Sequence, residues 1–313
     1  MDVCEKIPVL AIAGPTASGK TALSVRLAKA LDGEVISADS MQIYQGLQIS
    51  TAKPTAEEMQ GVPHHLLDFL PPDTPFSVAD YCERAKECVA DVHVRGKLPI
   101  LCGGTGLYMQ SFLENIDFSG EGSDPGFRQE MQTLADTQGT ETVWRRLQAV
   151  DPQGAETLHP NNLGRVIRAL ELYRQTGLTM AQQRLRSRKN PTPYNALVLC
   201  LDFHDRQRLY ERIDRRVDIM LESGLLDEAR AFYAQFGAHE GTARQAIGCK
   251  ELFPYFEGAC TLDEAVERIK RETRHYAKRQ LTWFRRMNHI QFIYADDETD
   301  AFASAMTAVR AWR

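Results

Sequence analysis

The chain has 313 residues, 43% of them hydrophobic and 25% charged; this composition excludes a disordered protein, and no apolar run is long enough to cross a bilayer. Its seven cysteines form no CxxC pair, which argues against a zinc site and indicates reduced thiols in a cytoplasmic protein. The net charge of −5, averaged over the chain, argues against a nucleic-acid partner, yet residues 161–313 carry 25 Lys and Arg against 20 Asp and Glu.

The first half of the chain alternates predicted strands and helices. Short apolar runs predict strands, and apolar residues at helical spacing predict amphipathic helices between them. We expect strands at 7–13, 34–38 and 98–102, and helices at 20–31 and 77–94. Because strands joined through helices pair in parallel, the pattern predicts an α/β fold, with a P-loop NTPase-like parallel sheet flanked by helices.

The turn after the first predicted strand carries a phosphate-binding motif. Residues 14–21 read Gly-Pro-Thr-Ala-Ser-Gly-Lys-Thr and match GxxxxGK[ST] between a strand and a helix. In such a P-loop the backbone N–H groups surround phosphate oxygens, Lys20 adds a positive charge, and Thr21 holds Mg²⁺ through its hydroxyl. The motif therefore predicts a diphosphate or triphosphate ligand without specifying a nucleotide.

Asp39 follows the second predicted strand, and Thr105 lies in a Gly-Gly-Thr-Gly turn, residues 103–106, after the third. Both are expected beside the phosphate site, because the carboxyl ends of parallel strands meet at one edge of a sheet. Asp39 could be a magnesium ligand, a catalytic base or a helix cap. The glycines of the turn permit close approach of the backbone to a ligand, and the Thr105 hydroxyl could hydrogen-bond it.

Residues 118–190 interrupt the alternation of strands and helices. They show helical spacing, as in Leu163, Val166, Ile167 and Leu170, and no strand pattern. We therefore predict a small all-helical insertion domain over 118–190, with residues 1–117 and 191–313 forming the core domain. The core is completed by a strand at 194–203, helices at 205–222 and 262–288, and a last strand at 291–294.

The densest positive charge lies at 268–286, with eight basic residues and one acidic residue, Glu272. Such a cluster attracts phosphates, or it marks a solvated helix face. Trp283 and Phe284, in the same predicted helix, fit the core better than a base-stacking surface.

His64 and His65 could be taken for metal ligands. Adjacent residues of a strand point to opposite faces, and no third ligand is suitably spaced. We expect both histidines to be structural.

Taken together, these motifs resemble the tRNA dimethylallyltransferase (isopentenyltransferase) family in its bacterial form. Two residues depart from the family's pattern: Ser50 stands where the family has glycine, and Cys249 stands where tyrosine is common. Neither residue has a part in the expected chemistry. The resemblance runs from about residue 9 to 286 and is carried by motifs at 14–21, 39–44, 51–54, 64–68, 103–108, 168–171, 245–248 and 277–285.

The resemblance implies an enzyme that transfers the dimethylallyl group of dimethylallyl diphosphate to N6 of adenosine 37, beside the anticodon, in tRNAs that read codons beginning with U. Diphosphate would be released, and the P-loop would bind the diphosphate of the donor rather than ATP. The resemblance further implies Mg²⁺ as cofactor and a monomeric cytoplasmic protein without membrane contact. The target base would be flipped out of the anticodon loop.

The same resemblance implies roles for individual residues. Asp39 would be the general base on the adenine amine, Thr105 would contact the amine or the donor, and Arg216 would neutralise the diphosphate. The choice among Arg212, Arg215 and Arg216 for that last contact stays open. The donor diphosphate would be bound by Gly14, Thr16, Ala17, Ser18, Gly19, Lys20, Thr21 and Arg212. The tRNA would be bound by Asp39, Ser40, Met41, Gln42, Thr105, Arg128, Gly164, Arg165, Arg168, Gln245, Gly248, Lys250, Lys278 and Arg279.

Three other interpretations compete with this one. A P-loop small-molecule kinase would use Asp39 to bind Mg²⁺ or an acceptor hydroxyl. An adenylate isopentenyltransferase would use the same donor with free AMP, ADP or ATP, and would need neither the helical insertion nor the basic segment. A non-enzymatic RNA-binding protein would not explain why the P-loop, Asp39 and Thr105 occur together.

Overall fold

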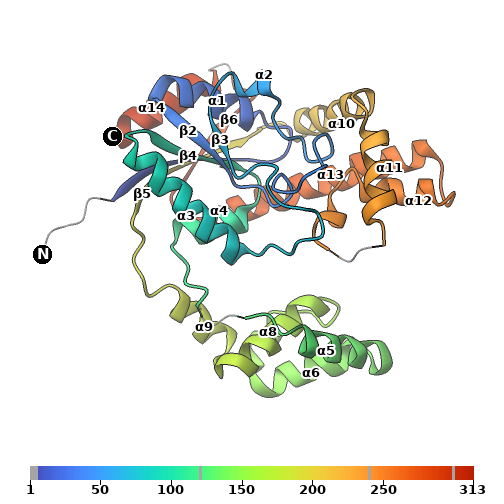
Figure 1. Cartoon of the computed structure of the whole chain (residues 1–313). Coiled ribbons are helices and arrows are strands. Elements are labelled where there is room, and N and C mark those ends of the chain that lie inside the picture. The colour runs from blue at the N-terminus through green and yellow to red at the C-terminus, as the bar shows by residue number, and fades with distance from the viewer. Residues whose placement is uncertain (1–5, 120–121, 239–240, 298–299) are drawn as a thin grey trace, which may run out of the picture. The chain divides into compact units, whose positions relative to one another are not determined.

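The computed structural model describes residues 6–119, 122–238, 241–297 and 300–313 (Figure 1). The chain forms two compact units. The first comprises Met1–Leu113 and Pro193–Arg313, and the second comprises Glu114–Thr192. No helix of the described ranges is both long enough and apolar enough to span a membrane.

The first unit is built on a parallel sheet of six strands in the order β3-β2-β4-β1-β5-β6. The predicted α/β class and parallel sheet are confirmed; the two-residue strand β3 was not predicted as an element. β1 lies between β4 and β5, which places the end of β1 next to the end of β4. The strands are β1 (Ile7–Ala13), β2 (Gly33–Ser37), β3 (His64–His65), β4 (Leu98–Gly103), β5 (Tyr194–Asp202) and β6 (Ile290–Tyr294).

Helices cover both faces of the sheet, α1 and α14 on one face and α3 and α4 on the other (Figure 1). Leu10 and Ile12 of β1 pack with Leu27 of α1 and Val309 of α14 in one buried cluster. Alternation along β1 turns Ala11 to the other face. The four helices are α1 (Lys20–Leu31), α3 (Val78–Val94), α4 (Gly106–Leu113) and α14 (Ala301–Trp312). A capping box begins α3, with Ser77 and Asp80 hydrogen-bonded to each other's backbone N–H.

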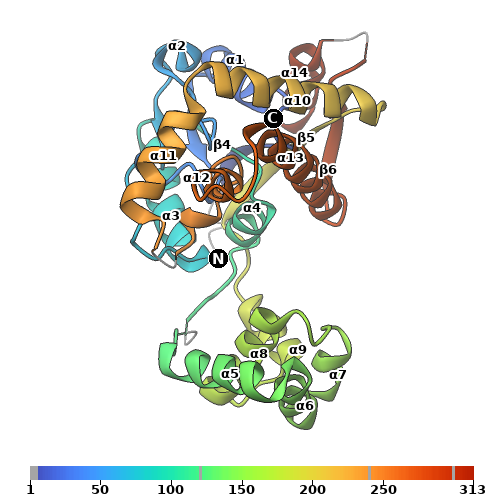
Figure 2. The same cartoon turned by 90° about the vertical axis from the view of Figure 1, so that its right-hand side faces the viewer.

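A group of helices lies beyond the carboxyl end of the sheet, on the right in Figure 1 and nearer the viewer in Figure 2. Ile43 and Leu47, from the segment after β2, pack there with Val217, Leu225 and Ile269. This group closes the sheet edge on which ligands are expected to bind. It contains α10 (Arg206–Glu222), α11 (Leu225–Phe236), α12 (Phe253–Phe256), α13 (Leu262–Phe284) and the short 3₁₀ helices η1 (Ala243–Gln245) and η2 (Lys250–Leu252). The short helix α2 (Ala56–Met59) lies beside α1.

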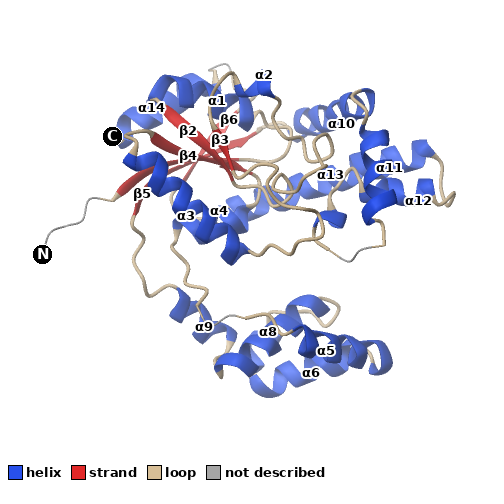
Figure 3. Cartoon of the chain, in the orientation of Figure 1, coloured by secondary structure: helices blue, strands red, loops and turns tan. Residues whose placement is uncertain are grey.

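The second unit contains helices and, in its described part, no strand (Figure 3). Its core includes Met131, Val143, Leu147 and Val166, which recur at helical spacing on three helices. The sequence predicted this insertion over 118–190, and the compact unit spans 114–192. Its helices are α5 (Pro125–Gln138), α6 (Thr140–Val150), α7 (Pro152–Glu156), α8 (Leu163–Thr176) and α9 (Met180–Ser187).

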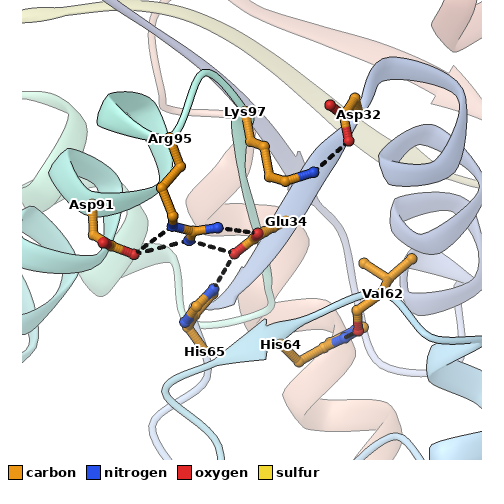
Figure 4. A network of polar contacts seen from close by, with 8 residues as sticks. All are labelled: Asp32, Glu34, Val62, His64, His65, Asp91, Arg95 and Lys97. Atoms are coloured by element: carbon orange, nitrogen blue, oxygen red, sulfur yellow. Dashed lines mark hydrogen bonds and ion pairs between the residues drawn. The ribbon is translucent and has the colours of Figure 1, made fainter.

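The adjacent histidines of β3 have separate structural partners (Figure 4). His65 Nε2 lies 2.8 Å from Oε2 of Glu34, a buried carboxylate that also accepts two hydrogen bonds from Arg95, whereas His64 Nδ1 lies 2.9 Å from the Val62 carbonyl oxygen. Hydrogen bonding to Arg95, with a smaller part from His65, lowers the pKa of Glu34 to about 2 against the effect of burial. Both histidines therefore make the contacts of structural residues, as the sequence predicted.

Candidate active site

A cavity of about 280 Å³ lies at the carboxyl edge of the sheet. The turns that follow β1, β2 and β4 contribute Thr16, Lys20, Asp39 and Gly103 to its wall. These turns meet because the three strands are neighbours in the sheet and run in the same direction. The phosphate motif and Asp39, which the sequence expected at one edge, thus line one cavity.

The P-loop has a special backbone conformation. Gly14 and Gly19 have φ angles of +149° and +91°, and Ala17 has a φ of +61°, which is uncommon for a residue with a side chain. Arg212 Nε donates a hydrogen bond of 2.9 Å to the Ala17 carbonyl oxygen and so supports this turn from α10. The Ser18 hydroxyl is buried and has no hydrogen-bond partner within the described residues.

Lys20 and Arg216 are half-buried cations beside this loop. Burial is the main cause that lowers the pKa of Lys20, and Arg216 acts in the same direction, whereas Cys102 and Asp39 oppose it. Burial likewise lowers the pKa of Arg216, against the attraction of Glu58 and Asp39. Two cations that have lost hydration and repel each other favour a ligand that carries more than one negative charge.

Asp39 is held by the backbone that follows it. Its Oδ1 accepts hydrogen bonds from the N–H of Met41 at 2.9 Å and of Gln42 at 3.4 Å. These bonds hold a turn; no helix begins here, so Asp39 is not the helix cap that the sequence allowed. Its Oδ2 has no hydrogen bond to any described residue. One carboxylate oxygen therefore fixes the turn while the other can act on a ligand.

Thr105 lies behind Ser40 and is not among the residues that line the cavity. Its Oγ1 accepts a hydrogen bond of 3.0 Å from the Ser40 N–H and donates one of 3.3 Å to the Ser40 hydroxyl. In this conformation its hydroxyl orients the turn that carries Asp39.

The glycines of the 103–106 turn are explained by packing within the protein. A Cβ atom on Gly103 would lie 2.2 Å from the Ala38 carbonyl oxygen, and one on Gly104 would lie 2.1 Å from Gln280 Nε2. A Cβ on Gly106 would lie 2.3 Å from Cδ1 of Trp283. From the sequence, these glycines were expected to let a ligand approach the backbone. Instead, protein atoms occupy the space where each Cβ would lie, and of the three glycines only Gly103 lines the cavity.

One wall of the cavity is apolar. α10 and α13, with the segment between them, contribute Ile213, Val217, Met220, Ile247 and Ile269. Lys20 and Arg216 line the same cavity and give it positive charge. This arrangement suits a ligand with a multiply charged anionic head and a short hydrocarbon tail.

The loop 49–52 is held in the cavity wall from two sides. Gln42 Nε2 donates to the carbonyl oxygens of Thr51 and Ala52 at 3.2 and 3.1 Å. Glu228 accepts hydrogen bonds from the Ser50 N–H at 2.8 Å and from the Ser50 hydroxyl at 2.7 Å. Ser50, which departs from the family pattern, thus makes a hydrogen bond that glycine could not. The amide of Gln42, expected to bind tRNA, is engaged in positioning this loop.

Arg212, Arg215 and Arg216 are separated by the structure. Arg216 lines the cavity, whereas Arg212 and Arg215 both line a second hollow, and Arg212 also donates a hydrogen bond to the P-loop. Arg216 is therefore the arginine that can reach a ligand in the cavity.

Part of the basic segment of α13 is neutralised within the protein. Lys270 pairs with Asp218 at 2.7 Å, Arg285 pairs with the buried Asp202 at 2.9 Å, and Arg274 pairs with Asp214. Lys278 and Arg279 are exposed and form no ion pair with any residue that the structure describes. Phe284 is buried and Trp283 is half-buried against Gly106, as expected of core residues.

The predicted site residues fall into three groups. Those that line the cavity are Thr16, Lys20, Thr21, Asp39, Ser40, Met41, Gln42, Arg216, Gln245, Gly248, Lys250 and Arg279. Those that belong to the first unit but do not line the cavity are Gly14, Ala17, Ser18, Gly19, Thr105, Arg212 and Lys278. Those in the second unit are Arg128, Gly164, Arg165 and Arg168; Arg128 and Arg168 are paired with the buried Glu171.

One face of α13 lines the cavity, and three of its residues were not among the predicted site residues. Thr273, Tyr276 and Gln280 line the cavity with Ile269. Their spacing of four, three and four residues marks one helix face, and polar residues on a face next to a buried stripe are the pattern that could have revealed them.

Comparison with known proteins connects this site to one family. The family model described as IPP transferase matches residues 42–287. A tRNA dimethylallyltransferase of Bacillus subtilis (strain 168) is 50% identical over 291 residues, which cover 93% of this chain and 91% of that protein. A tRNA dimethylallyltransferase of Caldanaerobacter subterraneus is 47% identical over 293 residues, or 93% of each chain.

Solved structures agree with these relatives. The full-length tRNA isopentenylpyrophosphate transferase from Bacillus halodurans superposes with a TM-score of 0.73 at 42% identity and covers 98% of this chain and 97% of that one. A eukaryotic dimethylallyltransferase acting on tRNA superposes with a TM-score of 0.83 at 31% identity, over 96% of this chain and 77% of that one.

Proposed function

The chain belongs to the IPP transferase family, and from that membership we propose that it transfers the dimethylallyl group of dimethylallyl diphosphate to N6 of adenosine 37 in tRNA. The acceptors are tRNAs that read codons beginning with U, and diphosphate is released. The observation that carries the proposal is a single cavity that combines a cationic P-loop end, an apolar wall and a carboxylate, Asp39.

The donor combines a charged diphosphate with an apolar five-carbon chain, and the cavity is lined by both cationic and apolar side chains. The diphosphate binds to the P-loop amides, Lys20 and Arg216, and the five-carbon chain lies against the apolar wall. The bond from the allylic carbon to oxygen breaks as negative charge moves onto the diphosphate. Lys20 and Arg216 stabilise that charge in a buried site, where such contacts have the largest effect on rate.

Asp39 takes the proton from the adenine amine. The amine becomes acidic only as its bond to carbon forms, so a carboxylate within hydrogen-bond reach can accept the proton in the transition state. The free Oδ2 of Asp39 serves this purpose, because Oδ1 remains bonded to the Met41 N–H.

The residues at the phosphate end fit Mg²⁺. Thr21 offers its hydroxyl oxygen, and the described residues contain no cluster of three carboxylate, histidine or cysteine side chains that would bind a cation by itself. Mg²⁺ commonly keeps waters and binds through one or two protein oxygens together with substrate phosphates. When bound, it supplies charge neutralisation to the departing diphosphate.

The tRNA is bound by the cavity mouth, by the exposed cations of α13 and by residues of the second unit, Arg128, Gly164, Arg165 and Arg168. The flipped adenine enters the cavity beside Asp39. The enzyme acts in the cytoplasm as a monomer; the described cysteines are all free thiols, in keeping with a reducing compartment.

The proposal is tested by supplying the purified protein with radiolabelled dimethylallyl diphosphate and Mg²⁺, with unmodified tRNA and AMP as separate acceptors. We expect label in tRNA alone. Label in AMP would instead identify an adenylate isopentenyltransferase. No label in either acceptor, with ATP-dependent phosphorylation of a small molecule, would identify a kinase.

Replacement of Lys20 by alanine should weaken donor binding and lower turnover. A charge-assisted hydrogen bond to an anion is worth about 1.5–3 kcal/mol, so the dissociation constant for dimethylallyl diphosphate should rise roughly tenfold to a hundredfold. Equilibrium dialysis with labelled donor measures this. The matched control is Lys29→Ala, which removes an exposed lysine from the last turn of the same helix; an unchanged donor affinity in Lys20→Ala would contradict the site.

Charge reversal of Lys278 and Arg279 to glutamate should weaken tRNA binding and reduce its salt dependence. Each phosphate contact that is lost should reduce the slope of log K against log salt by about 0.7–0.9. Filter binding over a salt series measures the slope. The matched control reverses the charge of Lys29 and Arg310, which are exposed in the last turns of α1 and α14. These two helices run away from the carboxyl ends of the strands, so their last turns lie at the amino ends. Equal slopes for the two double variants would show that Lys278 and Arg279 do not contact tRNA and belong to a solvated helix face.

A further inference from the structure

Gln280 links two turns that are far apart in the sequence. Its side chain is 5% exposed. Its Oε1 accepts a hydrogen bond of 2.9 Å from the Thr16 N–H in the P-loop, and its Nε2 donates one of 3.0 Å to the Gly104 carbonyl oxygen. One amide on α13 therefore holds the turn after β1 to the turn after β4.

The link explains two features of these turns. The N–H of Thr16 is directed to Gln280, so the phosphate cradle is left to the amides that follow Thr16 along the loop. Gly104 is required because a Cβ there would lie 2.1 Å from Gln280 Nε2. Gly104 does not have a left-handed φ, so the space taken by Gln280, rather than backbone conformation, excludes a side chain.

We propose that Gln280 is a positioning residue for the donor diphosphate, which holds the P-loop in its anion-binding conformation by fixing the Thr16 backbone. The inference rests on the proposed function, because it takes diphosphate as the ligand of this loop. A loop that is held in its bound conformation before the ligand arrives loses less entropy on binding, and affinity rises accordingly. Gln280 thus acts on the donor through the P-loop, and the tRNA contacts do not depend on it.

The first test replaces Gln280 by methionine, which has a similar length and cannot make either hydrogen bond. Binding of inorganic diphosphate with Mg²⁺ is measured by calorimetry, and KM is measured for donor and for tRNA. We expect affinity for diphosphate to fall about tenfold or more, with a matching rise in donor KM and an unchanged tRNA KM. The matched control is Gln235→Met, the same change at an exposed position of α11. Equal diphosphate affinity in Gln280→Met and the wild type would overturn the inference.

Two further variants separate positioning from a general effect on folding. In Gln280→Glu an ionised carboxylate cannot donate to the Gly104 carbonyl, whereas the protonated acid can both donate to Gly104 and accept from Thr16. Diphosphate affinity of this variant relative to the wild type should therefore recover as pH falls. Gly104→Ala should reproduce the loss seen in Gln280→Met, because it displaces the Gln280 amide. Parallel pH profiles, or full affinity in Gly104→Ala, would overturn the inference.

Failure of the proposed function would look different from failure of this inference. A folded wild-type protein that binds no diphosphate would overturn the function, and the inference with it. A wild-type protein that binds diphosphate, with variants that bind it equally well, would overturn the role of Gln280 alone.

Discussion

Asp39→Asn is expected to lower turnover of dimethylallyl transfer by at least about 100-fold and to leave tRNA affinity nearly intact. Asparagine keeps an oxygen that can accept from the Met41 N–H, so the turn after β2 should retain its shape. It cannot accept the proton of the adenine amine. The change therefore removes the base without removing a phosphate contact.

Single-turnover assays with labelled donor measure the chemical step, and filter binding measures tRNA affinity. Asp73→Asn is the matched control, because it makes the same chemical change at an exposed loop position of the same unit. Asp39→Ala should lose both the base and the hydrogen bond that Asp39 accepts from the Met41 N–H. It should therefore affect tRNA binding more than Asp39→Asn does. If Asp39→Asn lost tRNA affinity by the same factor as turnover, Asp39 would be a binding residue and the base would have to be sought elsewhere.

Glu171→Gln is expected to destabilise the second unit by about 3 kcal/mol. The Glu171 carboxylate is fully buried and accepts hydrogen bonds from Arg128, Arg168 and the Asp124 N–H. It therefore connects the start of α5 to α8. Removing its charge leaves two arginines at the unit's core without their counterion. The resulting loss of free energy of unfolding is larger than the contribution of an exposed ion pair.

Hydrogen exchange of the full chain followed by mass spectrometry locates this effect. Protection should fall in peptides from 114–192 and stay unchanged in the first unit. Glu141→Gln is the matched control, since it breaks an exposed pair with Arg145 at 3.5 Å that is worth at most about 0.5 kcal/mol. Equal protection in the two variants would show that the buried pair contributes little.

The pH dependence of this effect has a defined sign. Burial raises the pKa of Glu171, but the hydrogen bonds from Arg128, Asp124 and Arg168 outweigh it and hold the pKa at about 2, below the ordinary value of 4.5. A carboxyl whose pKa is lowered on folding stabilises the folded state above its ordinary pKa, and this stabilisation is lost as the pH falls. The difference in protection between wild type and Glu171→Gln should thus shrink between about pH 4.5 and 2.

Local sequence patterns were sufficient for much of the core domain. β1 and α1 occupy the residues that the apolar run 7–13 and the helical spacing at 20–31 predicted. The positive φ angles of Gly14 and Gly19 follow from the P-loop motif itself. These features depend on neighbouring residues, and a short stretch of sequence therefore contains the information that determines them.

Other elements of the core were not predicted. α4, α11 and α14 went unrecognised, and β3 has only two residues, too few for a periodic pattern. The helix predicted at 262–288, which corresponds to α13, ends at Phe284. Short elements and helix ends depend on packing against the rest of the protein, which local propensity does not describe.

The sequence by itself determined the parallel fold, the phosphate loop and the position of Asp39 at the sheet edge, since each follows from residues close together in the chain. Only the tertiary structure decided that Arg216 rather than Arg212 or Arg215 faces the cavity, because the three lie within five residues on one helix and packing selects among them. The same holds for Gln280, which meets Gly104 across 176 residues and Thr16 across 264. Contacts of this kind form when distant segments pack together, and no local pattern specifies which side chain will fill the space above a glycine.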